Sequence, residues 1–141
     1  MGNLKFSLFL GFQALSALVL LIVAALWPGP WHTQRVVGMG FLLVGTVFVL
    51  LARLQLGSSF SILPRAKKLV TRGLYSKIRN PIYIFGTIAI VGMLLILQIP
   101  RLWILLVVLV AIQIFRAGRE ARALEARFGE EYRAYRKQTW F

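Results

Sequence analysis

Long uncharged runs of apolar residues alternate with short polar stretches along the chain. Residues 6–27 carry no charge and are long enough to cross about 30 Å of hydrocarbon as a helix. A second run covers about residues 36–56, a third covers 81–99 and a fourth covers about 102–115. The pattern therefore predicts an all-α, polytopic membrane protein with four transmembrane helices.

The last part of the chain alternates apolar and charged positions instead. The fourth run is short for a full span, so it either ends at the interface or continues as one helix into the tail. In the tail, Ala117, Ala121, Leu124 and Phe128 fall on one face at helical spacing. We therefore expect an amphipathic C-terminal helix, interrupted near Gly129 and followed by a second short piece.

Small residues mark helix starts and helix contacts. Pro81 opens the third run, where the first turn of a helix loses nothing from the missing N–H. Gly38, Gly45 and Ala52 recur every seven residues along the second run. Such a face permits close helix contact and leaves room for a homodimer.

A basic connection, residues 57–80, divides the chain into a two-helix membrane anchor at 1–56 and a core at 57–141. The connection carries six Lys and Arg residues and no acidic one, and the tail carries seven. The other two turns between the apolar runs contribute only Arg35 and Arg101. Because cytoplasmic loops are enriched in Lys and Arg, we expect both termini and the connection to face the cytoplasm.

Composition supports an integral membrane protein. Hydrophobic residues make up 59% of the chain and charged residues 15%, whereas soluble domains carry about 25% charged residues. The net charge of +13 lies beside apolar runs, so anionic lipid headgroups are the expected partners and nucleic acid is not. The chain has no cysteine and one histidine, His32, so we expect no metal site.

Candidate chemistry gathers where the basic connection meets the third run. The motif R-N-P-x-Y at 79–83 places an arginine and a tyrosine four residues apart, on one helix face. Gly86 follows one turn later and would let a ligand or another backbone approach. After the hairpin, Glu120 emerges on the same side of the membrane. Two distant segments are thus predicted to meet at the cytoplasmic edge.

The two segments together carry a recognisable pattern. Residues 73–83 read G-L-Y-S-K-I-R-N-P-I-Y, and residues 120–135 read E-A-R-A-L-E-A-R-F-G-E-E-Y-R-A-Y. This resembles the integral-membrane isoprenylcysteine carboxyl methyltransferase and phospholipid methyltransferase family, in which G-x-Y-x-x-x-R-H-P-x-Y precedes a hairpin and E-E-x-x-L-x-x-x-F-G-x-E-Y-x-x-Y. The chain departs at Asn80, where relatives carry His, and at Ala121, where they carry a second Glu.

The resemblance implies an S-adenosylmethionine-dependent methyltransferase acting on a lipid or other apolar acceptor, prenylcysteine-like or phospholipid-like, that enters from the bilayer. It gives Arg79 the catalytic role of steering an acidic or phosphate-bearing acceptor, since a guanidinium binds such oxygens in fork geometry. It implies that Glu120 meets the ammonium or ribose of the cofactor. The full cofactor-binding set implied is Tyr75, Asn80, Pro81, Tyr83, Gly86 and Glu120.

Other interpretations of the same residues stay open. Steroid and sterol reductases, which use NADPH, carry a loosely similar N-Y segment and aromatic tail. A non-catalytic membrane scaffold would keep the helices without the family's His and second Glu. Arg79 could simply set topology, Tyr83 could belong to the interfacial aromatic belt, and Glu120 could pair with a neighbouring arginine on the tail surface.

Overall fold

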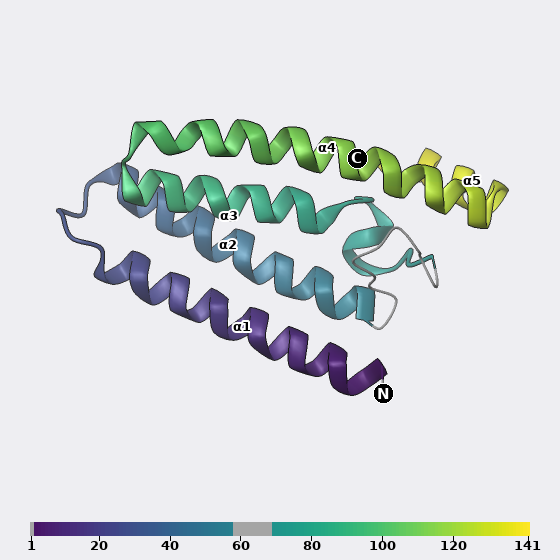
Figure 1. Ribbon diagram of the computed structural model, residues 1–141, viewed down its shortest axis with the longest axis horizontal. Coiled ribbons are helices and arrows are strands. Elements are labelled where there is room, and N and C mark those ends of the chain that lie inside the picture. Colours follow the sequence, from purple (N-terminus) through teal and green to yellow (C-terminus); the bar gives the residue numbers. More distant parts are fainter. Residues whose placement is uncertain (1, 58–68) are drawn as a thin grey trace.

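Long helices lie side by side in the computed structural model, which describes residues 2–57 and 69–141 (Figure 1). The four long helices are α1 (Gly2–Leu26), α2 (Thr33–Leu56), α3 (Pro81–Leu97) and α4 (Trp103–Phe128). The shorter elements are α5 (Glu130–Gln138) and the 3-10 turns η2 (Gly73–Ser76) and η3 (Pro100–Leu102). The described ranges contain no strand, and the predicted all-α fold is confirmed.

Three helical segments are long and apolar enough to cross a membrane. They cover Asn3–Leu26, Thr33–Leu56 and Pro100–Phe128. The helix α3 is apolar but has 17 residues, which at 1.5 Å per residue makes it about 25 Å long. The chain is therefore an integral membrane protein, and the predicted count of four spans depends on α3.

The helix α4 continues without a break from the fourth apolar run into the basic tail. The fourth apolar run ends near residue 115, whereas the helix ends at Phe128. Of the two courses expected from the sequence, continuation of the fourth run into the tail as one helix is therefore the observed one. Gly129, with a φ of +54°, ends the helix, and its N–H donates to the Glu125 backbone oxygen at 2.8 Å. The predicted interruption at Gly129 is confirmed, since α5 begins at the next residue.

Glycines bring α2 and α3 into backbone contact. A methyl group added at Gly38 would lie 2.7 Å from the backbone oxygen of Gly92, and one added at Gly45 would lie 2.4 Å from the backbone nitrogen of Ala89. The small-residue face that the sequence offered to a homodimer is thus filled by α3 of the same chain. The homodimer stays a prediction, and the small-residue face of α2 no longer supports it.

Arg35 ties the end of α1 to the start of α2. Its side chain is almost completely buried, with 2% of the residue exposed. The guanidinium donates to four backbone oxygens, those of Ala24 and Ala25 at 3.2 Å, Trp27 at 2.6 Å and Gly29 at 2.7 Å. The last carbonyls of a helix have no intrahelical donor, so Arg35 caps the C-terminal end of α1. The sequence-based prediction used Arg35 only as a charge that indicates membrane orientation, and it missed this capping role.

The long helices alternate in direction, so the connections fall at two ends of the bundle (Figure 1). The N-terminus, the segment that follows residue 69 and α5 share one end, and the turns after α1 and α3 lie at the other. Three predicted cations of the basic connection, Arg65, Lys67 and Lys68, lie outside the described residues. The division of the chain into an anchor and a core at residue 57 stays a prediction. The contact between α2 and α3 joins these two predicted parts.

Candidate active site

The glycine-tyrosine segment that precedes α3 is fixed to its surroundings on both sides. Gly73 has a φ of +61°, which favours glycine, and an added methyl group would lie 2.4 Å from Gln55 Oε1. That oxygen accepts the backbone N–H of Leu74 at 2.7 Å. Tyr75 is buried, and its backbone oxygen accepts the Tyr135 hydroxyl at 2.6 Å. The segment therefore joins the end of α2 to α5.

The two tyrosines of this contact stay protonated at neutral pH. Burial raises the pKa of Tyr75, and the nearby charge of Arg53 only partly opposes the effect. Burial also raises the pKa of Tyr135 to about 12, with Tyr132 adding to the shift and Arg79 opposing it. The Tyr135 hydroxyl is thus a lasting donor to the loop.

Immediately before α3, the backbone pairs with the C-terminal segment of the chain. The Trp140 N–H donates to the Lys77 oxygen at 3.0 Å, and the Arg79 N–H donates to the Trp140 oxygen at 3.3 Å. Asn80 donates twice to the backbone oxygen of Phe141, from its backbone N–H at 2.8 Å and from Nδ2 at 3.2 Å. The carboxamide of Asn80 is therefore held by a residue far away in the sequence.

The antiparallel hairpin of α3 and α4 brings the two motif halves together. The Tyr83 hydroxyl on α3 donates to Glu120 Oε1 on α4 at 2.5 Å. The guanidinium carbon of Arg116 lies 5.8 Å from the centre of the Tyr83 ring. A carboxylate is thus fixed by a tyrosine and flanked by a cation at the end of the bundle that carries α5.

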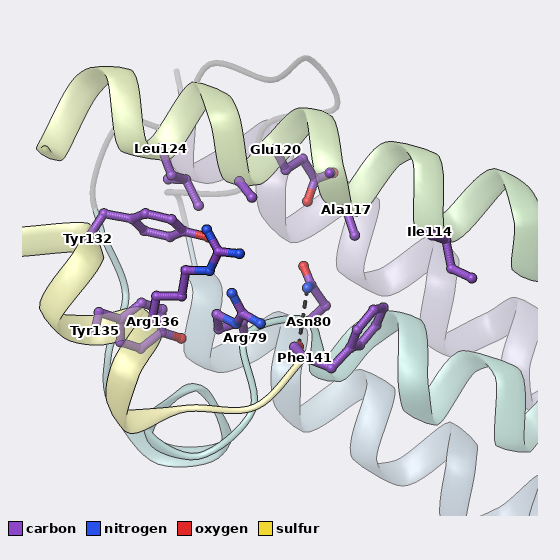
Figure 2. A pocket seen from close by; sticks show the side chains of 12 residues that line it. Arg79, Asn80, Ile114, Ala117, Glu120, Leu124, Tyr132, Tyr135, Arg136 and Phe141 are labelled. Carbon is purple, nitrogen blue, oxygen red and sulfur yellow. Dashed lines mark hydrogen bonds between the residues drawn. The ribbon is translucent and has the colours of Figure 1, made fainter.

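A cleft of about 230 Å³ opens between the residues before α3, the helix α4 and α5 (Figure 2). Its polar lining comes from Arg79, Asn80, Glu120 and Arg136. Tyr132, Tyr135 and Phe141 contribute aromatic rings, and Ile114, Ala117, Gly118, Ala121 and Leu124 form the wall on α4. Both signs of charge and an apolar wall therefore face one space.

Three of the site residues proposed from the sequence line this cleft. Glu120 reaches it from α4, while Arg79 and Asn80 reach it from the loop side (Figure 2). The Nε atom of Arg79 is buried and has no hydrogen-bond partner among the described residues. A buried donor of this kind is costly unless it is satisfied, so the arginine is suited to an anionic group.

The other four proposed residues lie around the cleft and not on its lining. Tyr83 stands behind Glu120 as its hydrogen-bond donor. Pro81 is buried in the first turn of α3, where it starts the helix. Gly86 faces α2, with Val49 Cγ2 4.0 Å from where a methyl group would be. Tyr75 holds α5 through its backbone oxygen.

Sequence reasoning missed the contribution of α5 and the C-terminal segment. Tyr132 and Tyr135 were already visible in the F-G-x-E-Y-x-x-Y pattern, which could have given them a role. The lining residues Arg136 and Phe141 carried no such signal. The place of Phe141 depends on backbone pairing with Asn80, which no local pattern announces.

Comparison with known families agrees with this arrangement. The sequence profile of the family described as phospholipid methyltransferase matches residues 33–131. The chain belongs to the phospholipid methyltransferase family. A search of curated proteins gives no significant match.

Membership in the phospholipid methyltransferase family makes the chain a member of a group of membrane methyltransferases. The matched range contains Arg79, Asn80, Tyr83 and Glu120, and with them the contact between the two motif halves. It ends at residue 131, so the lining residues that α5 and the C-terminal segment contribute lie beyond it.

Proposed function

We propose that this member of the phospholipid methyltransferase family uses S-adenosylmethionine to methylate a lipid or other apolar acceptor in the cleft of Figure 2. The observation that carries the proposal is the meeting of Glu120 with Arg79 and Asn80 around one space. In this proposal α3 also spans the membrane, which gives four spans. The cleft end of the bundle faces the cytoplasm, because the cations concentrate there.

The groups that line the cleft fit the cofactor. S-adenosylmethionine carries a carboxylate, an ammonium, a sulfonium and a planar base. Glu120 offers a carboxylate to its positive groups, and Arg136 offers a guanidinium that binds a carboxylate in fork geometry. The rings of Tyr132 and Phe141 offer flat apolar surfaces of the kind that accepts a base.

When bound, the cofactor would supply an electrophilic methyl group on its sulfonium sulfur: the lone pair of an acceptor would form a bond to the methyl carbon, and the carbon–sulfur bonding pair would leave with the sulfur as a neutral sulfide. The protein's task in such a displacement is alignment. Arg79, which lines the cleft, would hold acidic or phosphate oxygens of the acceptor through its guanidinium fork. The C-terminal segment holds Asn80 and the loop in place through the Phe141 oxygen.

A lipid acceptor can reach this cleft from the bilayer. Ile114 lines the cleft and is also 57% exposed on the outer face of α4. Val107, Val108 and Phe115 continue the same helix as exposed apolar side chains. An acyl or prenyl chain can therefore stay in hydrocarbon along α4 while its polar end turns into the cleft at Ile114.

Ligand-dependent thermal stability in nanodiscs tests the proposal. S-adenosylhomocysteine at 100 times its dissociation constant should stabilise the protein by about 2.7 kcal/mol, and NADPH should not. Glu120→Gln keeps the shape of the side chain and removes its charge, so this variant should lose most of the stabilisation. Glu131→Gln is the matched control, because Glu131 is an exposed carboxylate outside the cleft lining.

The same measurement separates the competing functions. Stabilisation by NADPH alone would favour a reductase, and correctly folded protein that responds to neither ligand would favour a scaffold. Transfer of a labelled methyl group to vesicles then compares an aminophospholipid with a prenylated cysteine carboxylate as acceptor. Preference for the phosphate-bearing lipid should fall in Arg79→Gln.

A further inference from the structure

Few side chains of α4 are buried within the chain, although Leu106, Leu109 and Val110 are half-buried. Only 6% of the most apolar stretch of α4 is buried within the chain, against 28% in α2. Ala117, with 8% of the residue exposed, is the one buried residue of α4. The α2–α3 contact, in contrast, is held by backbone approaches at glycines. With so little of α4 buried, its hydrogen bonds to α3 contribute to how it faces the cleft.

Two side-chain hydrogen bonds cross between α3 and α4 at different heights. Tyr83 donates to Glu120 at 2.5 Å, and Thr87 lies 2.9 Å from Gln113 Oε1. Tyr83 and Thr87 are one turn apart on α3, while Gln113 and Glu120 are two turns apart on α4, or about 10 Å along its axis. A helix held at a single point can pivot, but a helix held at two such points cannot.

The hydrogens of this cluster can be assigned by counting donors. The Thr87 hydroxyl lies 2.8 Å from the Tyr83 backbone oxygen and 2.9 Å from Gln113 Oε1, yet it has one proton to give. The oxygen and nitrogen of a carboxamide exchange places when the group turns over. With the Gln113 amide turned, its NH₂ donates to Thr87, and Thr87 donates to Tyr83.

Two separate hydrogen-bonded contacts thus join α3 to α4. One runs from Gln113 to the Thr87 hydroxyl and on to the backbone of Tyr83, and in the other the Tyr83 hydroxyl donates to Glu120. In a low-dielectric surrounding, such bonds are stronger than in water and a broken one leaves polar groups unsatisfied. The Thr87–Gln113 contact thus acts on the carboxylate that lines the cleft through the placement of α4 against α3.

We propose that Thr87 and Gln113 are positioning residues, which fix the rotation of α4 and thereby hold Glu120 at the cleft. The inference rests on the proposed function in one respect, that Glu120 meets the positive groups of the cofactor. Neither residue lines the cleft, so both act through Glu120. Thr87→Val removes the hydroxyl at nearly constant shape, and Thr87→Ser restores it.

A distance measurement tests the positioning role without any ligand. The chain has no cysteine, so spin labels at Leu54→Cys and Arg119→Cys report on α4 relative to α2 without background. Both positions are exposed, on α2 and α4 respectively. We expect one narrow distance distribution in the labelled parent and in Thr87→Ser, and a broader or shifted one in Thr87→Val. Unchanged width and position in Thr87→Val would overturn the inference.

Ligand affinity provides the second measurement. The dissociation constant of S-adenosylhomocysteine should rise about tenfold in Thr87→Val and return towards the parent value in Thr87→Ser. A contact that only stabilises the fold would lower the melting temperature and leave this constant unchanged, which contradicts the inference. Should Thr87→Val fail to fold, Gln113→Leu breaks the same contact from α4 and is read by the same criteria.

The two measurements separate the inference from the proposed function. If the parent protein does not bind S-adenosylhomocysteine but the distance distributions change as expected, the proposed function fails and the positioning role stands. If the parent protein binds the ligand and Thr87→Val binds it equally well, the positioning role fails and the proposed function stands.

Discussion

Arg35 carries its charge within a shell of backbone oxygens near the membrane-spanning part of the chain. Removing a guanidinium from water is costly unless its N–H groups find acceptors. Here the two Nη groups donate to four carbonyl oxygens at the end of α1 and in the turn after it, Nε has no partner among the described residues, and the Trp31 ring lies 4.1 Å from the guanidinium carbon. The cost of burial is offset by the same bonds that terminate the helix.

Replacing Arg35 should therefore destabilise the protein strongly. Arg35→Ala leaves buried carbonyl oxygens without donors and should lower the free energy of unfolding by about 2–4 kcal/mol. Arg35→Lys should recover only part of the loss, because an ammonium lacks the flat fork that reaches several oxygens at once. Denaturant unfolding in detergent measures both variants. The exposed Arg101→Ala serves as control, and a loss as large in Arg101→Ala would contradict the capping role.

We expect Tyr135 to make the folded protein less stable at high pH. Because burial raises its pKa to about 12, its neutral form is favoured in the folded state. The resulting stabilisation is fully present below about pH 10, the ordinary pKa of tyrosine, and is lost as the pH rises through about 12. Thermal unfolding should show this loss in the parent protein and a smaller one in Tyr135→Phe. Identical pH profiles would contradict the docking role of this hydroxyl.

Single residues also show where sequence reasoning stopped. Glu120 was identified from its motif, and its carboxylate does line the cleft. The resemblance assigned Asn80 to ligand contact, and the structure adds that its amide donates to the Phe141 oxygen while the residue lines the cleft. That partner is 61 positions away, so only the folded backbone could reveal it.

At the scale of helices, the sequence predicts that a helix exists better than it predicts where the helix ends or which other helix it contacts. Long apolar runs have no alternative to helix in a bilayer, so α1 to α4 were all expected. For the fourth run the sequence left two courses open, an end at the interface or continuation to Gly129, because charged residues at the interface do not stop a helix. The spacing of Gly38 and Gly45 announced a close approach, but small residues carry no information on which helix approaches.

The α2–α3 contact yields a comparison within one helix. Gly45→Ala places a methyl group 2.4 Å from the Ala89 nitrogen, so the helices must separate and stability should fall by about 1–3 kcal/mol. Gly40→Ala, also on α2, meets no atom within 4 Å and should stabilise by up to about 1 kcal/mol. Unfolding of the two variants side by side measures the difference. Equal effects would mean that α3 does not lie against this face.

At the scale of the whole molecule, the cleft exists because four helices alternate in direction. The segment before α3 and the helix α5 come to the same end of the bundle, where Asn80 and Phe141 join them (Figure 1). Neither segment forms the cleft alone, since the lining combines both with α4. The family match covers α2, α3 and α4, and the tail beyond residue 131 completes the lining of the cleft.

In the proposed four-span topology, α3 crosses the membrane despite its 17 residues. In a chain without cysteine, single cysteines can be tested with an impermeant thiol reagent in vesicles of known orientation. Ser76→Cys and Gln138→Cys should react only when the cytoplasmic face is outside, and Arg101→Cys only when the opposite face is outside. All three positions are exposed, so failure to react reports sidedness. If Arg101→Cys reacts from the same side as Ser76→Cys, α3 enters and leaves the membrane by the same face and does not span it. The Trp103 end of α4 would then lie at the cytoplasmic side, and the proposed route of the lipid along α4 would run in the opposite direction across the membrane.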